Sequence, residues 1–115
     1  MYMMSHRQIK AAEIIAHMAA DFFARSSNTP QSGSSLITVT RAEISPDLKN
    51  VKVFLSVLPE HLEKTALAFA KRNRTDFRDY LKGHSVMRYL PTIDFELDYG
   101  EKNRQRIDEL TRKNG

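Results

Sequence analysis

Several residue types and motifs are missing from this chain, and their absence narrows the possible functions. The sequence of 115 residues contains no cysteine, which excludes disulfides, thiolate metal sites and cysteine nucleophiles. No apolar run approaches the roughly 20 residues that a membrane-spanning helix requires, and no signal-peptide pattern opens the sequence. The chain also lacks G-x-S-x-G, P-loop and H-E-x-x-H motifs. We therefore expect a cytoplasmic, non-catalytic protein without cofactor, metal, membrane or small-molecule substrate.

The positive charge is concentrated in one segment. The whole chain has 18 lysines and arginines against 14 acids, a net charge of +4. Residues 71–88 contain six of these basic side chains and two acids. The basic residues of this segment are Lys71, Arg72, Arg74, Arg78, Lys82 and Arg88. A local excess of this kind is compatible with a polyanionic partner such as a nucleic acid.

The first predicted element is an amphipathic helix that ends near Arg25. Ser5 and Gln8 have the spacing of a capping box, and Met4 and Ile9 have that of a hydrophobic staple. The apolar stripe expected to face the core is Ala11, Ile14, Ile15, Met18 and Phe22. Residues 26–35, SSNTPQSGSS, are too poor in apolar groups to pack and are expected to form a flexible loop.

Residues 36–58 have the pattern of an antiparallel β-hairpin. In its second half Val51, Val53, Leu55 and Val57 alternate with other residues, which is typical of a half-buried strand. The first half, residues 36–44, is rich in β-branched residues. Between the halves, Ser45-Pro46-Asp47 has turn chemistry.

A second helical region is predicted after the hairpin, beginning at Pro59. Its apolar stripe is interrupted, which predicts two helices that meet at a kink formed by Asn73, Arg74 and Thr75, with Thr75 as the N-cap of the second. Gly83 fits either a helix end or the interior of a longer helix.

A third strand is expected to open at Pro91, followed by a short helix in the tail, residues 100–115. Ile93, Phe95, Leu97 and Tyr99 would form its apolar face, and Thr92, Asp94, Glu96 and Asp98 its outer face. The element order α–β–β–α–α–β(–α) predicts a single α+β domain spanning residues 1–115. It would have a three-stranded sheet with the helices on one face.

Four basic residues share a helical spacing that favours contact with phosphates. Lys71, Arg74, Arg78 and Lys82 follow i, i+3, i+7 and i+11, so a helix would place them along one ridge. A solvated helix face explains the same pattern. Three acids, Asp94, Glu96 and Asp98, could hold a divalent ion as in a nuclease, but alternating acids more often keep a sheet face wet. Because these acids would repel phosphate, and because Phe54 beside them is expected to be covered by a loop, RNA is expected on the helical side.

Three stretches resemble the bacterial ribosome-binding factor A family. They are VTRAEISPDL at residues 39–48 with VKVFLSVL at 51–58, MRYLPTIDF at 87–95, and RIDEL at 106–110. The resemblance implies a type II KH-like fold. It further implies a monomeric assembly factor that binds the 30S ribosomal subunit and 16S rRNA and supports late processing of the rRNA precursor.

The clustered charge supplies the residues for this contact. We expect Arg74, Arg78 and Lys82 to touch the RNA backbone together with Lys71, Arg72 and Arg88, and Arg7 and Lys10 of the first helix to extend the patch. The chain has no G-x-x-G loop, in agreement with the family, but Asn73-Arg74-Thr75 stands where the family has an Ala-x-Gly kink. The alternative is a protein-interaction module that recognises a ribosomal protein or an assembly GTPase without touching RNA.

Overall fold

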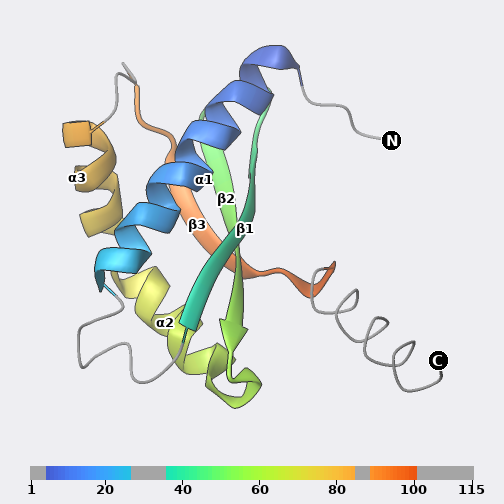
Figure 1. Cartoon of the computed structure of the whole chain (residues 1–115). Coiled ribbons are helices and arrows are strands. Elements are labelled where there is room, and N and C mark those ends of the chain that lie inside the picture. Colours follow the sequence, from blue (N-terminus) through green and yellow to red (C-terminus); the bar gives the residue numbers. More distant parts are fainter. Residues whose placement is uncertain (1–4, 27–35, 85–88, 101–115) are drawn as a thin grey trace.

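In the part of the chain that the structure describes, three α-helices and three strands follow one another in the order that the sequence predicts (Figure 1). The computed structural model describes residues 5–26, 36–84 and 89–100. The elements are α1 (His6–Ser26), β1 (Leu36–Ile44), β2 (Asn50–Leu58), the 3₁₀ turn η2 (Glu60–Leu62), α2 (Glu63–Arg72), α3 (Arg74–His84) and β3 (Thr92–Leu97). Apart from Gly100 and Ser26, the predicted tail helix and the predicted flexible loop lie outside the described residues. Within those residues, no helix is long and apolar enough to cross a membrane.

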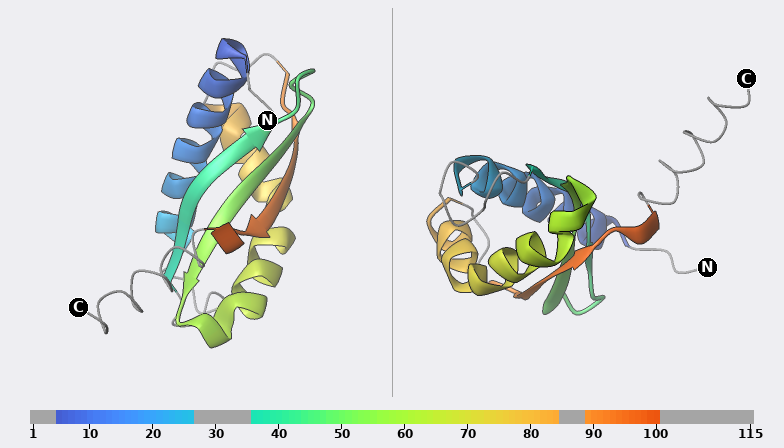
Figure 2. Two further views of the ribbon diagram at one scale, coloured as in Figure 1. Left: turned by 90° about the vertical axis from the view of Figure 1, so that its right-hand side faces the viewer. Right: turned by 90° about the horizontal axis from the view of Figure 1, so that it is seen from below.

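The strands form one mixed sheet in the order β1-β2-β3. β1 and β2 are antiparallel, with Ile44 opposite Val51, whereas β2 and β3 are parallel, with Val53 opposite Phe95. The helices lie on one side of this sheet (Figure 2). α1 packs mainly on β1, and α2 packs on β3 and β2. The predicted α+β architecture with helices on one face is therefore confirmed.

The N-terminus of α1 is closed by the predicted capping box. The Gln8 backbone N–H donates to Ser5 Oγ at 3.2 Å, and the Ser5 backbone N–H donates to Gln8 Oε1 at 2.8 Å. The Gln8 side chain is also buried, and its Nε2 donates to the Ile44 carbonyl oxygen at the end of β1, at 2.9 Å. One residue thus caps the helix and attaches it to the sheet.

The buried face of α1 differs from the predicted stripe by about one residue. The side chains that face the sheet are Gln8, Ala12, Ile15, Ala19 and Phe23. Ile14, predicted to be buried, is 41% exposed. The prediction favoured large apolar residues, but small Ala12 and Ala19 let the helix approach the sheet closely, and the Gln8 bond fixes its rotation. This close approach lets the helix and the sheet pack at the density that is usual in protein interiors.

A β-bulge interrupts β1 near its middle. Val39 lies opposite Leu55 and Arg41 opposite Phe54, so Thr40 is the extra residue. A bulge of this kind shifts the alternation of side chains between the two faces of the sheet. The core-facing residues of β1 accordingly change from Ile37 and Val39 before the bulge to Ala42 and Ile44 after it.

Aromatic rings fill the space between α1, α3 and the sheet. Phe23, Phe77 and Phe95 are almost fully buried. The ring centroids of Phe23 and Phe95 lie 5.3 Å apart in an edge-to-face arrangement, and those of Phe77 and Phe95 lie 5.9 Å apart. Such pairs contribute beyond the apolar area that they bury. They fix α1 and α3 relative to β3.

Three predicted boundaries are wrong. Pro59 adopts an extended conformation and precedes η2, with its carbonyl oxygen accepting from the Leu62 N–H at 3.0 Å, so α2 begins only at Glu63. The extended chain has to turn away from β2 before a helix can start. β3 begins at Thr92, just after Pro91, and ends at Leu97; Tyr99, beyond its end, is 63% exposed. Gly83 lies inside α3, which matches the longer of the two predicted helices.

Candidate nucleic-acid interface

The break between α2 and α3 occurs at Asn73. Its backbone, at φ −99° and ψ 15°, leaves helical geometry. The Asn73 N–H donates to the carbonyl oxygens of Phe69 and Ala70, and its Nδ2 donates to Phe69 O at 2.8 Å. The Asn73 carbonyl oxygen then accepts from the Phe77 N–H at 2.9 Å, which starts the next helix. The short amide therefore ends α2 by bonding back to it.

The predicted N-cap of α3 is wrong. α3 begins at Arg74, so Thr75 lies within its first turn and the residue that precedes the helix is Asn73. Because Asn73 already supplies the backbone carbonyl that the first turn needs, a second cap at Thr75 is not required. The Thr75 side chain is exposed and lines a surface hollow instead.

Two basic residues of the predicted ridge meet in that hollow. Arg74 and Arg78, one turn apart on α3, line an open depression of about 310 Å³. Its other lining residues are Thr75, Thr92 and Ile93. Two guanidinium groups and two hydroxyl-bearing side chains at one concave place form a set of donors that suits an anion such as a phosphate.

Lys71 and Arg74 share a carboxylate, Asp94, on the edge strand β3. Asp94 Oδ1 lies 3.8 Å from Lys71 Nζ and 3.5 Å from Arg74 Nη1. All three side chains are partly exposed, so the direct electrostatic gain is small. The contacts instead hold the basic side chains of α2 and α3 on the β3 side of the helix break.

The other predicted contact residues are distributed around this centre. Arg72 and Lys82 are exposed on α2 and α3, and Lys10 is exposed on α1. Arg88 lies outside the described residues. Arg7 does not join the ridge; it lines a second hollow at the other side of Thr92.

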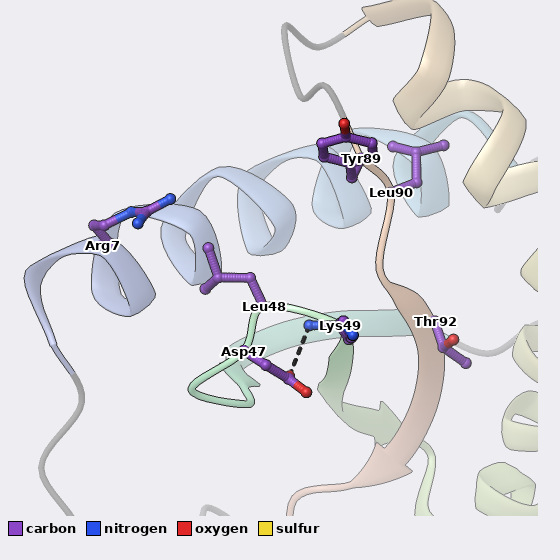
Figure 3. Close-up of a pocket in the computed structure, with 7 residues that line it drawn as sticks. All are labelled: Arg7, Asp47, Leu48, Lys49, Tyr89, Leu90 and Thr92. Carbon is purple, nitrogen blue, oxygen red and sulfur yellow. Dashed lines mark hydrogen bonds between the residues drawn. The ribbon is translucent and has the colours of Figure 1, made fainter.

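The second hollow lies between α1, the β1–β2 turn and the residues that lead into β3 (Figure 3). Its volume is about 610 Å³. Its lining residues are Arg7, Asp47, Leu48, Lys49, Tyr89, Leu90 and Thr92. Thr92 lines both hollows, so they adjoin each other at the start of β3.

Sequence reasoning missed Lys49 and Tyr89 in this second hollow. Lys49 lies in the turn of the hairpin, and Tyr89 is an aromatic side chain with 78% exposure. Tyr89 has the same odd-numbered spacing as Ile93 and Phe95, so the alternating apolar pattern does not mark it as an exposed residue. No local pattern relates these positions to Arg7, which is far away along the chain.

The turn that carries Lys49 is held by Asp47. Asp47 Oδ1 accepts from the Ser45 hydroxyl at 2.5 Å and from the Lys49 backbone N–H at 3.0 Å. These hydrogen bonds, the one from Ser45 first, lower the pKa of the Asp47 carboxyl group below its ordinary value. The carboxylate is consequently ionised at neutral pH.

The outer face of the sheet differs from the sequence prediction. Phe54 is buried, and among the described residues the guanidinium of Arg41 lies over its ring, 3.9 Å from the ring centroid. Asp98, predicted to be exposed, is 5% exposed and bonds to Thr40 Oγ1 and Arg41 Nε at 2.5 and 3.3 Å. The bulge in β1 makes room for this contact by turning both residues to the outer face.

The remaining acids of this face are paired with separate cations. Glu96 lies 3.4 Å from Lys52 Nζ, while Asp94 is turned towards Lys71 and Arg74. Among the described residues, no three acidic or histidine side chains gather closely enough to hold a metal ion. The nuclease alternative therefore lacks a metal site in this part of the chain.

The chain is similar to known proteins over most of its length. The family model of ribosome-binding factor A matches residues 7–111. Ribosome-binding factor A of Thermomicrobium roseum is 32% identical over 112 residues, covering 96% of this chain and 85% of that protein.

The fold is shared with solved structures. The crystal structure of ribosome-binding factor A from Thermus thermophilus is 22% identical, with a TM-score of 0.63, covering 75% of this chain and 90% of that one. Coordinates of the same factor from T. thermophilus, a homology model fitted into the cryo-EM map of a 30S complex, are 24% identical with a TM-score of 0.57, covering 75% and 92%. The predicted KH-like fold is thereby confirmed.

Proposed function

The chain belongs to the ribosome-binding factor A family, and from this premise we propose that it is a non-catalytic factor that docks on the immature small ribosomal subunit. In this proposal it contacts 16S rRNA as a monomer in the cytoplasm and supports late maturation and processing of the rRNA precursor. A related factor from T. thermophilus has been placed in a complex with the 30S subunit, which supports the choice of partner.

The observation that carries the RNA contact is the hollow that Arg74 and Arg78 line. Phosphate oxygens accept bidentate hydrogen bonds from guanidinium groups, and the rigid first turn of α3 fixes the spacing of the two arginines. Lys71 and Arg72 lie in the last turn of α2, just before the helix break, so they can contact further phosphates of the same RNA strand. Each phosphate contact releases counterions, so binding should weaken steeply as salt rises.

Asp94 has a defined place in this proposal. Its carboxylate keeps Lys71 and Arg74 oriented before RNA arrives. When a phosphate binds, these cations can turn from Asp94 to the incoming anion, because all three groups are partly exposed. Contacts of this type position the RNA backbone and give little sequence specificity.

Charge reversal at the hollow tests the proposal. The variant Arg74→Glu/Arg78→Glu should lose co-sedimentation with free 30S subunits on a sucrose gradient. The matched control is Lys52→Glu/Lys64→Glu, which makes the same change in net charge at exposed positions outside the hollow. Thermal denaturation should show both variants folded. If the hollow variant still binds as wild type does, the assignment of this surface to the subunit is refuted.

The protein-interaction alternative is separated by nuclease treatment. The factor is bound to 30S subunits, the RNA is digested, and the proteins that remain attached to the factor are identified. RNA contact predicts that the factor is released by digestion. A ribosomal protein or GTPase retained on the factor would favour the alternative.

A further inference from the structure

We propose that the hollow between α1, the β1–β2 turn and the residues before β3 seats one unpaired nucleotide of an RNA strand, with its base stacked on Tyr89. This inference rests on the proposed function, because it assigns a second RNA contact to the same protein. It concerns a different surface from the Arg74 and Arg78 hollow, and it predicts a preference for single-stranded RNA that phosphate contacts alone do not provide.

The size and lining of this hollow suit a nucleotide. Its volume of about 610 Å³ lies within the range of small-molecule sites, roughly 300–1,000 Å³. Leu48 and Leu90 supply apolar surface, and Tyr89 supplies an aromatic ring (Figure 3). Arg7 and Lys49 supply positive charge from two separate elements, α1 and the hairpin turn. The apolar and aromatic surface suits a base, and the positive charge suits its phosphate.

The exposure of Tyr89 is the observation that points to a base. Its relative exposure of 78% is the largest among the exposed large hydrophobic residues of the described chain. Packing against the core therefore does not explain its ring. Stacking of a base on an aromatic side chain contributes about 1–3 kcal/mol, and only a base that has left its helix can reach such a ring.

Leu48 forms the side of the hollow that the hairpin contributes, and its backbone is unusual. Its φ of 61° lies in the left-handed region, which is unfavourable for a residue that carries a side chain. Glycine would adopt this conformation without strain, yet the leucine side chain is half-buried against the apolar core. The Leu48 N–H donates to the Ser45 carbonyl oxygen at 2.8 Å, which closes the turn. The turn is thus preformed, with an apolar side chain held at the hollow.

The charges around the hollow determine where the phosphate and the base of the bound nucleotide lie. Asp47 is ionised and would repel a phosphate, so the phosphate belongs near Arg7 and Lys49. The base then lies between Leu48 and Tyr89. Thr92 lines this hollow and the one formed by Arg74 and Arg78, so neighbouring nucleotides of the same strand can reach both.

The test compares single-stranded and duplex RNA. Binding of the full chain to a fluorescein-labelled RNA hexamer and to a duplex of equal length is measured by anisotropy, for wild type, Tyr89→Leu and Tyr89→Phe. Tyr89→Leu should weaken hexamer binding by about fivefold or more, as expected for the loss of one stacked base. It should leave duplex binding within twofold, and Tyr89→Phe should restore hexamer binding.

The other outcomes would contradict the proposal, and each shows whether the nucleotide seat alone or the proposed function as well has failed. Equal hexamer affinity for wild type and Tyr89→Leu, with Arg74→Glu/Arg78→Glu defective, would overturn the nucleotide seat and leave the proposed function intact. Absence of all RNA binding by a wild-type protein that still sediments with 30S subunits would overturn both. In a further arm, 5′-AMP or 5′-UMP competes with the hexamer; displacement at equimolar nucleotide would identify a free mononucleotide as the ligand and refute the RNA strand.

Discussion

Asp98 provides the sharpest test of how the sheet is held together. It follows the last residue of β3, and its backbone N–H donates to Leu55 O on β2 at 2.8 Å. Its side chain, 2% exposed, reaches across β2 to the bulge of β1, where it meets Thr40 Oγ1 at 2.5 Å and Arg41 Nε at 3.3 Å. One carboxylate thus connects the two outer strands of the sheet.

The expected loss on replacing Asp98 by alanine follows from these contacts. A hydrogen bond to a charged acceptor contributes about 1.5–3 kcal/mol, and Thr40 makes a short one. Arg41 is 45% exposed, so water replaces much of its interaction and its share is well below that of a buried ion pair. We therefore expect Asp98→Ala to lower the free energy of unfolding by about 3 kcal/mol, which corresponds to a fall in Tm of roughly 10 °C or more.

Three further variants define the experiment. Asp98→Asn keeps an acceptor for Thr40 but loses the charge, so it should lose about half as much. Glu96→Ala removes a 41% exposed acid beside Lys52 and should change stability by less than about 0.5 kcal/mol. A double-mutant cycle of Asp98→Ala with Thr40→Val, measured by urea denaturation, should give a coupling energy of about 1–2 kcal/mol. Equal stability of Asp98→Ala and Glu96→Ala, or a coupling near zero, would refute this account of the contact.

The remaining predictions concern α1, the core and the turn. Gln8→Ala removes both a helix cap and the bond to the Ile44 carbonyl and should lower the free energy of unfolding by about 2 kcal/mol in denaturant titration; a loss under about 0.5 kcal/mol would contradict it. Phe95→Ala empties a fully buried ring site and should cost about 3–5 kcal/mol by the same measurement. The pKa of Asp47 is lowered in the folded state, first by the hydrogen bond from Ser45, so the ionised carboxylate stabilises the fold at every pH above its unfolded pKa. This stabilisation is lost as pH falls through the folded pKa. The Tm difference between wild type and Asp47→Asn should accordingly be constant above about pH 5 and shrink towards about pH 3; a difference that grows on acidification would contradict the sign.

The elements were predictable because each has a local cause. The capping box at Ser5 and Gln8 marks the start of α1, and alternation in β2 marks a strand with one buried face. The break at Asn73 was visible as an amide interrupting an apolar stripe. These signals lie within a few residues of one another, so a single sequence contains them in full.

The rotation of α1 and the roles of Thr40 and Asp98 were not predictable in the same way. Each depends on a partner on another element, and sequence alone does not give the register of that element. The shift of apolar residues from odd positions, Ile37 and Val39, to even positions, Ala42 and Ile44, does signal a bulge in β1. It does not reveal that a carboxylate 58 residues further along would bond to the extra residue.

In the candidate interface, too, local features were predictable and contacts between separate elements were not. The basic segment and its helical spacing are properties of one stretch, so the ridge could be proposed from the sequence. The hollow with Arg74 and Arg78 also requires Thr92, and the second hollow requires residues from three parts of the chain. Its exposed aromatic, Tyr89, lies outside the basic helices α2 and α3, and among the described residues that were predicted to contact RNA, only Arg7 lines this hollow.

The hairpin has a larger part in the proposed interface than its sequence pattern suggests. The Thr92 N–H donates to Lys49 O at 2.7 Å, so the hairpin turn fixes the first residue of β3, and Asp98 fixes the segment after its end. Both hollows depend on the position of Thr92. An edge strand bound at its two ends to the hairpin therefore holds the arginines of α3 and the residues around Tyr89 in one arrangement. A change in the hairpin turn that frees Thr92 should therefore weaken RNA binding at both hollows, measured by fluorescence anisotropy, without altering any basic side chain of α2 or α3.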